Sequence, residues 1–590
     1  MKFKLDFLQK ACAGVRKRYF LVKRRYGFKI IDGSLTSTTL FETILLLKKI
    51  FKINKYAKQL ELTLRWDRAY NNIRQLKALA SFIPRIHRYA ELKMIFDSYS
   101  GDFELEDLHL LRYFFVNLKE LRGIVLDFSQ TEIYHDDLFF ISKGIKSCPQ
   151  VEKLVLNFSS CLGIDDVALF HLKNGIKNLL GLKVLGLNFS WSPTFGKRSI
   201  LEFCKLKFSH LERVKLGLKR NFDPYNIPQN TNLGSSLTGL KEIELYNEKV
   251  YLGPTQRLLL KSKDTLTRVV ISLCNLQSDD SGNPNIPIES TNPSLEFLKE
   301  FTKLRSLSLD FKSTYLPESL TSSILNIMTD CPKIIKFELD LTNCTGLTEG
   351  HLFRIFDSLD KFEDLKTFSL KIGSQKASET KTFCDKFFTK LLRSWKAPSS
   401  LINFSFDCAY TKEVTDNVIG QLGKMLITCQ KMKTLHIGFQ SAAKISDRGL
   451  DQLTEIIQGK PDLQEISLNF ESCQKVNGVG LDNLFQSIMA IPKLECLRLD
   501  FDQTGFCNKG LQNVFLTLTK LRELHLTCVA CPELTTLSFP AKIDFRYLKN
   551  LKVLDLNMQF SGIKTTSEFR LLRKKVESQA IWLEHFNLQV

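Results

Sequence analysis

Residues 463–501 have the sequence LQEISLNFESCQKVNGVGLDNLFQSIMAIPKLECLRLDF and contain the starts of two similar units. The first follows the pattern L-x-x-L-x-L-x-F-x-x-C from Leu463, and the pattern returns from Leu494 to Thr504, 31 residues later. Alternation inside the pattern is typical of a strand, whereas GVGLDNLFQSIMAIP between the copies has apolar residues at helical spacing. The unit is a strand, a turn and a helix, and its fixed period predicts a repeat protein.

The second aliphatic residue of each strand motif marks the repeats along the chain. These markers advance from residue 62 to residue 588 in steps of about 31 residues. We expect a parallel strand centred within two residues of each marker. The markers are Leu62, Met94, Leu126, Leu156, Leu187, Leu216, Leu245, Ile271, Leu309, Leu339, Leu370, Phe406, Ile437, Leu468, Leu499, Leu526, Leu556 and Leu588.

The repeats resemble the leucine-rich repeat family, and specifically its ribonuclease-inhibitor-like subclass, with the pattern L-x-x-L-x-L-x-x-[NC]-x-[LI]. This chain adds an x-F pair before the cysteine, as in residues 156–161, which accounts for the longer period. The resemblance covers about residues 57–590. It implies an α/β fold: a curved right-handed solenoid, or horseshoe, of about 18 strand–turn–helix repeats with a parallel sheet on the concave face.

Some segments depart from the regular period. Two long steps predict surface insertions near residues 276–293 and 373–396. Two short steps, near Leu245 and Leu526, predict extended or 3₁₀ chain in place of a helix. Residues 1–56 fit the pattern poorly, and we expect them to form a basic N-terminal cap made of degenerate repeats, ahead of the solenoid at 57–590.

The chain is basic, and its positive charge is concentrated at the N-terminus. Its 590 residues carry 83 Lys+Arg against 63 Asp+Glu, for a net charge of +20. Residues 1–100 hold 22 of these bases and only 7 of the acids. A cluster there mixes bases with aromatic residues, which suits nucleic acid, anionic lipid or an acidic protein, and equally suits a solvated cap helix. The bases of this cluster are Arg16, Lys17, Arg18, Lys23, Arg24 and Arg25.

The cysteines indicate a reduced protein. The chain has 15 of them, no apolar secretory segment at its start and no run of 18 apolar residues, so we expect an intracellular protein of the cytoplasm or nucleus. One turn position recurs as Cys161, Cys344, Cys473, Ser192, Thr131 and Thr504. We predict that the three cysteines of this set are buried thiols.

Cys528 and Cys531 form a C-x-x-C motif with His525 close by. Both cysteines fall on regular positions of the repeat, and a structural zinc site needs four ligands, so we interpret the pair as core residues. No phosphate-binding loop, zinc-protease or kinase signature is present. We therefore expect no enzyme activity, catalytic residue, metal or cofactor.

The loop after the strand often has the pattern [ILV]-[ST]-[DE]-x-G, as at residues 445–449, or part of it, as at 347–350 and 414–416. A serine or threonine there can cap the next helix, and the acid beside it suits the helix dipole. We therefore expect Ser446, Thr348 and Thr415 to be helix caps.

Polar residues at the ends of the strands should lie together on the concave face. One interpretation is a solvated row whose carboxylates accept loop amides, and another is a docking surface for a neutral or basic polypeptide. This row contains Asp127, Asn157, Asn188, Asp310, Asp340, Asp407, Asn469, Asp500 and Asn557.

We predict a non-enzymatic scaffold or adaptor that binds a protein partner on the concave face. The alternative is a nucleic-acid-associated protein that uses the basic N-terminal region. The chain ends in a strand motif, residues 586–590, for which we expect an end-on contact with another chain.

Overall fold

The structure is a computed structural model. It describes residues 19–24, 27–32, 59–66, 89–96, 112, 115–116, 121–192, 206, 208–217, 239–246, 259–273, 295–373, 383–537, 543–563, 566–580, 583 and 585–589. The chain divides into two compact units, Met1–Thr267 and Arg268–Val590. The predicted insertion at 276–293 lies outside the described residues.

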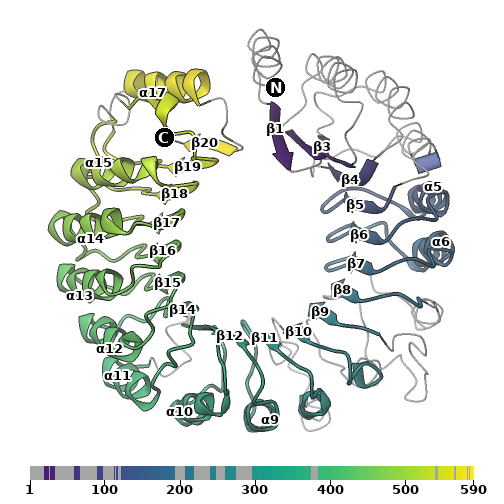
Figure 1. The fold of residues 1–590 in the computed structure, drawn as a ribbon, viewed down its shortest axis with the longest axis horizontal. Coiled ribbons are helices and arrows are strands. Elements are labelled where there is room, and N and C mark those ends of the chain that lie inside the picture. Colours follow the sequence, from purple (N-terminus) through teal and green to yellow (C-terminus); the bar gives the residue numbers. More distant parts are fainter. Residues whose placement is uncertain are drawn as a thin grey trace. The chain divides into compact units, whose positions relative to one another are not determined.

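The first unit is a ladder of strands (Figure 1). Strands β2 to β9 pair in parallel, each with the next along the chain, whereas β1 pairs with β2 antiparallel. The strands are β1 (Tyr19–Arg24), β2 (Gly27–Asp32), β3 (Gln59–Trp66), β4 (Tyr89–Phe96), β5 (Gly123–Asp127), β6 (Lys153–Asn157), β7 (Val184–Asn188), β8 (Arg213–Gly217) and β9 (Glu242–Tyr246).

The second unit continues the same pattern with parallel pairs throughout. Its strands are β10 (Arg268–Ser272), β11 (Ser306–Asp310), β12 (Lys336–Thr342), β13 (Thr367–Gly373), β14 (Asn403–Asp407), β15 (Thr434–Gly438), β16 (Glu465–Asn469), β17 (Cys496–Asp500), β18 (Glu523–Thr527), β19 (Val553–Asn557) and β20 (His585–Gln589). Every predicted marker lies in one of the strands β3 to β20, so the strand prediction is confirmed.

Helices follow the strands and pack on one face of each unit's sheet (Figure 1). The first unit has α5 (His135–Lys146) and α6 (Asp166–Ile176). The second has α9 (Glu318–Asp330), α10 (Glu349–Ser358), α11 (Asp385–Ser394), α12 (Asp416–Leu426), α13 (Asp447–Gln458), α14 (Gly478–Ala490), α15 (Asn508–Leu516) and α17 (Thr566–Gln579), with 3₁₀ turns η4 (Glu296–Glu300), η5 (Leu359–Lys361), η6 (Thr517–Thr519) and η7 (Phe545–Tyr547). None of the described helices is long and apolar enough to cross a membrane.

The core lies between helices and sheet because both present an apolar stripe to it. In β16, Ile466 and Leu468 are buried while the alternate residues are partly exposed. Leu484 and Ile488 of α14 are fully buried on the other side. Burial of each such side chain contributes about 2 kcal/mol to the free energy of folding. The side chains of one repeat are too few to keep that repeat folded alone, so stacking on neighbouring repeats stabilises the array. Each unit is an α/β solenoid of strand–turn–helix repeats, as predicted.

Phenylalanines that follow the strands stack from repeat to repeat. Phe158 lies between Phe128 and Phe189 with ring centroids 5.6 Å apart on both sides. In the second unit, Phe470 lies 6.0 Å from Phe439 and 5.9 Å from Phe501. These columns are packed at the distances that aromatic rings prefer, and they link adjacent repeats.

The recurring turn position adds a second link between repeats. Cys161 donates to the Phe128 carbonyl at 2.9 Å, and Cys473 donates to the Phe439 carbonyl at 3.1 Å. Burial raises the pKa of Cys161 to about 11 and that of Cys473 to about 12, so both stay protonated. Cys161, Cys344 and Cys473 are buried thiols, as predicted.

The [ILV]-[ST]-[DE]-x-G motif joins one repeat to the next. Thr348 and Thr415 accept amide hydrogens of their own helices, as predicted. The prediction is wrong for Ser446, which makes no side-chain cap. Its amide and hydroxyl instead donate to Asp416 of the preceding repeat, at 2.8 and 2.7 Å. A Cβ at Gly449 would lie 2.6 Å from a carboxylate oxygen of Asp416, so glycine at this position leaves room for the contact between Asp416 and Ser446.

Some local predictions need correction, and one is only partly covered by the structure. Of the insertion predicted near residues 373–396, residues 374–382 lie outside the described part, and Asp385–Ser394 form α11, a repeat helix. The short step before Leu526 keeps a helix, α15, where extended or 3₁₀ chain was expected. The basic cluster was interpreted as nucleic-acid-like or as a cap helix, and the helix is wrong for residues 19–24, which form β1.

Candidate functional site

The face of each sheet opposite the helices, called here the open face, carries the residues between the core positions. The predicted polar row is present there in register: Asp127 aligns with Asn157 and Asn188. The row continues in the second unit, where Asp310 aligns with Asp340. The remaining members, Asp407, Asn469, Asp500 and Asn557, occupy the same position of their strands.

Residues of this row accept the backbone amide two residues further on. The amide of Ser129 donates to Asp127 at 3.0 Å, and that of Glu471 donates to Asn469 at 2.9 Å. The same bond is formed at Asn157, Asn188, Asp310, Asp340, Asp407, Asp500 and Asn557. Side chains of this type commonly end a strand by satisfying the turn that follows. The row therefore has a structural task, in line with the interpretation of carboxylates bonded to loop amides.

Asp407 is a member of the row whose carboxylate is only partly satisfied. Burial raises the pKa of its carboxyl, Asp340 raises it further, and Lys371 opposes both. Its Oδ1 is fully buried, and no hydrogen-bond partner for it occurs within the described part of the chain. Gly438 on the next strand leaves room for this carboxylate, since a Cβ there would lie 2.8 Å from it.

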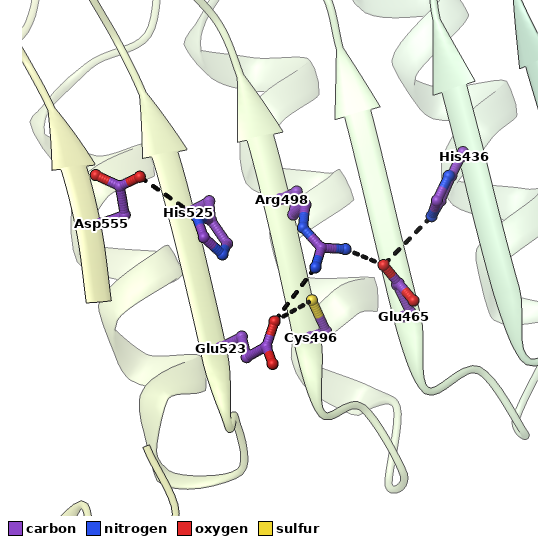
Figure 2. Close-up of polar contacts among 7 residues, drawn as sticks. All are labelled: His436, Glu465, Cys496, Arg498, Glu523, His525 and Asp555. Atoms are coloured by element: carbon purple, nitrogen blue, oxygen red, sulfur yellow. Dashed lines mark hydrogen bonds and ion pairs between the residues drawn. The ribbon is translucent and has the colours of Figure 1, made fainter. Parts of the chain in front are cut away.

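An ionic network crosses the open face of β15 to β18 (Figure 2). The Arg498 guanidinium lies between two carboxylates, contacting Glu465 on one side and Glu523 on the other, the latter at 3.2 Å. These three side chains are 30 to 40% exposed. One cation thus neutralises two acids, a pattern stronger than an isolated surface pair.

Two neighbours of this network are held in their neutral forms. His436 Nε2 lies 3.4 Å from Glu465, yet burial and the positive charge of Arg498 lower the pKa of its ring. The thiol of Cys496 lies 3.6 Å from Glu523, and burial together with that carboxylate raises its pKa to about 12. Cys496 is consequently a poor nucleophile, and the network has no activated acid–base pair.

Three further carboxylates gather where β16 and β17 end, at Glu471, Asp500 and Asp502. Burial raises the pKa of Asp500 to about 6, with added repulsion from Asp502 and Glu471. Burial also raises the pKa of Asp502, although the Val529 amide donates to it at 2.6 Å. Within the described ranges no lysine or arginine pairs with any of the three. This cluster is a concentration of carboxylates on the second unit's open face that no cation of the described residues neutralises.

The open face of the first unit is balanced instead. Lys153 pairs with Glu91 at 2.9 Å, and Lys215 pairs with Glu244 at 3.3 Å. Arg213 approaches Glu242 at 3.5 Å. From β4 to β9 the charged residues of this face are Glu91, Lys93, Asp127, Lys153, Arg213, Lys215, Glu242 and Glu244, equal numbers of each sign.

Other candidate residues of the sequence have no site geometry. Cys528 and Cys531 are buried core thiols, and no group of three or more His, Cys, Asp or Glu in the described chain could hold a metal. His525 turns away from them toward Asp555, at 3.4 Å (Figure 2). Of the basic cluster, Arg16, Lys17, Arg18 and Arg25 lie outside the described residues, and Lys23 and Arg24 lie on β1.

The sequence analysis missed the network around Arg498. Its members are 25 to 33 residues apart in the chain and meet only through strand register. Aligning the repeats column by column shows Glu465, Cys496 and Glu523 in one row and Arg498 in the next. That alignment was a signal already present in the 31-residue period.

Comparison with known proteins gives distant likenesses. No family model and no curated protein matches the sequence. A chain of the yeast Rad7 and Elc1 complex is 14% identical, with a TM-score of 0.39, covering 79% of this chain and 88% of that one. An internalin (inlF) from Listeria monocytogenes is 10% identical, with a TM-score of 0.25, covering 86% of this chain and 89% of that one. The fold assignment rests on the repeat geometry of the chain itself.

Proposed function

We propose that the protein is a non-enzymatic scaffold or adaptor that binds a protein partner on its open face. The observation that carries this proposal is the open face itself. In each unit the helices pack on one side of the sheet (Figure 1). On the other side, aligned and partly exposed side chains cross the strands, as polar Ser467 and Arg498 do on β16 and β17. Adjacent strands stand about 4.8 Å apart, so a partner that crosses them meets a new side chain at every strand.

The predicted row from Asp127 to Asn557 forms the border of this surface. Since its side chains accept turn amides, we assign it the role of holding the strand ends in place. Contacts with a partner fall to the two outward rows before it, which contain Glu465 and Ser467, and to charged residues at the strand ends that lack a cationic partner in the described chain, such as Asp500. We also infer the ribonuclease-inhibitor-like subclass, because full α-helices such as α12 and α14, of 11 and 13 residues, follow the strands.

Site-specific photo-crosslinking in cells tests the proposal. A photoreactive amino acid replaces Ser467 on the open face, or Glu455 on the helix side of the adjoining repeat. We expect a protein partner to be labelled from position 467 and not from position 455. Labelling from position 455 alone, or equal labelling from both, contradicts binding at the open face.

A second candidate function is nucleic-acid association through the N-terminal region. It is favoured by the charge of residues 1–100, with 22 bases against 7 acids. Phosphate contacts release counterions, so the affinity for a duplex should fall steeply as salt rises. Replacing Arg16, Lys17, Arg18, Lys23, Arg24 and Arg25 by glutamine should then reduce that slope. A slope that is shallow and unchanged in the variant rules this function out.

A further inference from the structure

The open face of β16 to β18 has an excess of negative charge. Its outward residues and the turns that follow include five carboxylates and one guanidinium. These are Glu465, Glu471, Asp500, Asp502, Glu523 and Arg498. Arg498 is already held by Glu465 and Glu523 (Figure 2). The local excess therefore resides at the other three carboxylates.

Interactions within the chain satisfy these three carboxylates only in part. Asp500 accepts the Asp502 amide at 3.3 Å, and Asp502 accepts the Val529 amide at 2.6 Å. Glu471 contacts the Gln440 side chain. Amides supply partial positive charge, but no full positive charge reaches the cluster from the described residues. The three acids repel one another at the edge of an otherwise polar, uncovered face.

We propose that Glu471, Asp500 and Asp502 bind lysine or arginine side chains of a basic segment of a partner protein, which lies across β16 to β18. This inference rests on the proposed function, and it names the class of partner and the part of the open face that it contacts.

The surroundings of the cluster favour a polypeptide over a metal ion. Groups of His, Cys, Asp and Glu able to hold a metal are absent from the described chain. Ser467 and the Ser472–Gln503 pair lie beside the acids and can donate to or accept from a peptide backbone. Because the whole chain carries +20, a basic segment is repelled elsewhere and gains attraction only at a local acidic face.

Fluorescence anisotropy with a synthetic peptide tests the proposal on the full chain. The probe is a fluorescein-labelled peptide of alternating arginine and serine, and its counterpart has glutamate in place of arginine. The test variant is E471Q/D500N/D502N. A matched control, E349Q/D357N/E455Q, removes the same charge from exposed helix positions. Urea unfolding of both variants checks that they fold.

We expect the arginine peptide to bind the wild type at physiological salt, and its affinity for the test variant to be lower by about 10-fold or more. The control should stay within about 2-fold, and the glutamate peptide should not bind through this face. Equal loss in both variants, no loss in the test variant, or no binding to the wild type overturns the proposal. Calcium binding measured by calorimetry, present in the wild type and lost in the test variant, also overturns it. If the arginine peptide does not bind but position 467 still crosslinks to a protein partner, the proposed function stands and only this inference is overturned.

Discussion

The two open faces are built on the same repeat but carry different charge. In the first unit, Lys153 neutralises a carboxylate two strands away, and Lys215 neutralises one on the neighbouring strand. In the second, Arg498 contacts two carboxylates, and Glu471, Asp500 and Asp502 pair with no lysine or arginine of the described residues. The strand register, the turn amides and the phenylalanine columns are common to both. The difference indicates that the repeat fixes the row at the strand ends, through its bonds to turn amides, and leaves the charge of the other outward positions free to vary.

The largest expected effect concerns what the two regions share. Phe158→Ala in the first unit and Phe470→Ala in the second each remove a ring stacked between two others. Each should lower the free energy of unfolding by about 3–4 kcal/mol, because both leave a cavity in a fully buried column. Urea unfolding measures both. If the two variants lose unfolding free energy in amounts that differ by more than about 2 kcal/mol, the cores of the two units are not equivalent.

The next-largest effect on stability should distinguish the open face of the second unit from that of the first. Arg498→Ala leaves Glu465 and Glu523 without their common cation, and we expect a loss of about 1–2 kcal/mol after allowing for partial exposure. Lys153→Ala breaks one pair with Glu91 and should cost less than about 1 kcal/mol. Arg498→Lys, which keeps the charge but loses the two-sided contact, should fall between. The ranking is wrong if the Lys153 variant is the less stable of the two alanine variants.

A smaller effect depends on pH. Because the pKa of Asp500 is raised to about 6, ionisation of this carboxyl destabilises the folded chain. The penalty is absent below the unfolded-state pKa of about 4, where both states are protonated, and it grows as pH rises to about 6. Asp500→Asn keeps an acceptor for the Asp502 amide, as asparagine does at position 469.

The Asp500→Asn variant should therefore be more stable than the wild type at about pH 7, by about 1 kcal/mol, and equal to it at about pH 4. Asp500→Ala also removes the acceptor for the Asp502 amide, so its gain in stability at about pH 7 should be smaller. Thermal unfolding at the two pH values measures the difference. A gain of the same size at both pH values would exclude ionisation as its cause.

The smallest effect again tests the equivalence of the two regions. Cys161→Ser and Cys473→Ser should each cost less than about 1 kcal/mol, because Ser192 already donates to the Phe158 carbonyl at 2.7 Å in the same position. The alanine variants, in which the Phe128 and Phe439 carbonyls lose the side-chain donor, should cost more. Chemical denaturation compares the four proteins. Serine variants less stable than the alanine variants would contradict the hydrogen-bonded role.

The fold was predictable from the sequence because its period is a local signal. Leu468 and Leu499 mark strands that pair in register, as their spacing predicts. The candidate site was predictable only in part. The row from Asp127 to Asn557 was found by the same alternation, but its bonds to turn amides depend on backbone geometry. The Arg498 network depends on contacts across three strands, and β1 was missed because its cluster of bases carries no repeat pattern.

The most direct test of the central claim is a charge scan at matched positions of the two open faces. Ser467 lies in the middle of β16 and Val155 in the middle of β6. Binding of the arginine peptide is measured by anisotropy for Ser467→Glu, Ser467→Lys, Val155→Glu and Val155→Lys. We predict tighter binding for Ser467→Glu, about 10-fold weaker binding for Ser467→Lys, and changes within about 2-fold at Val155. Equal responses at both positions would contradict the claim that the second unit's open face is the binding surface.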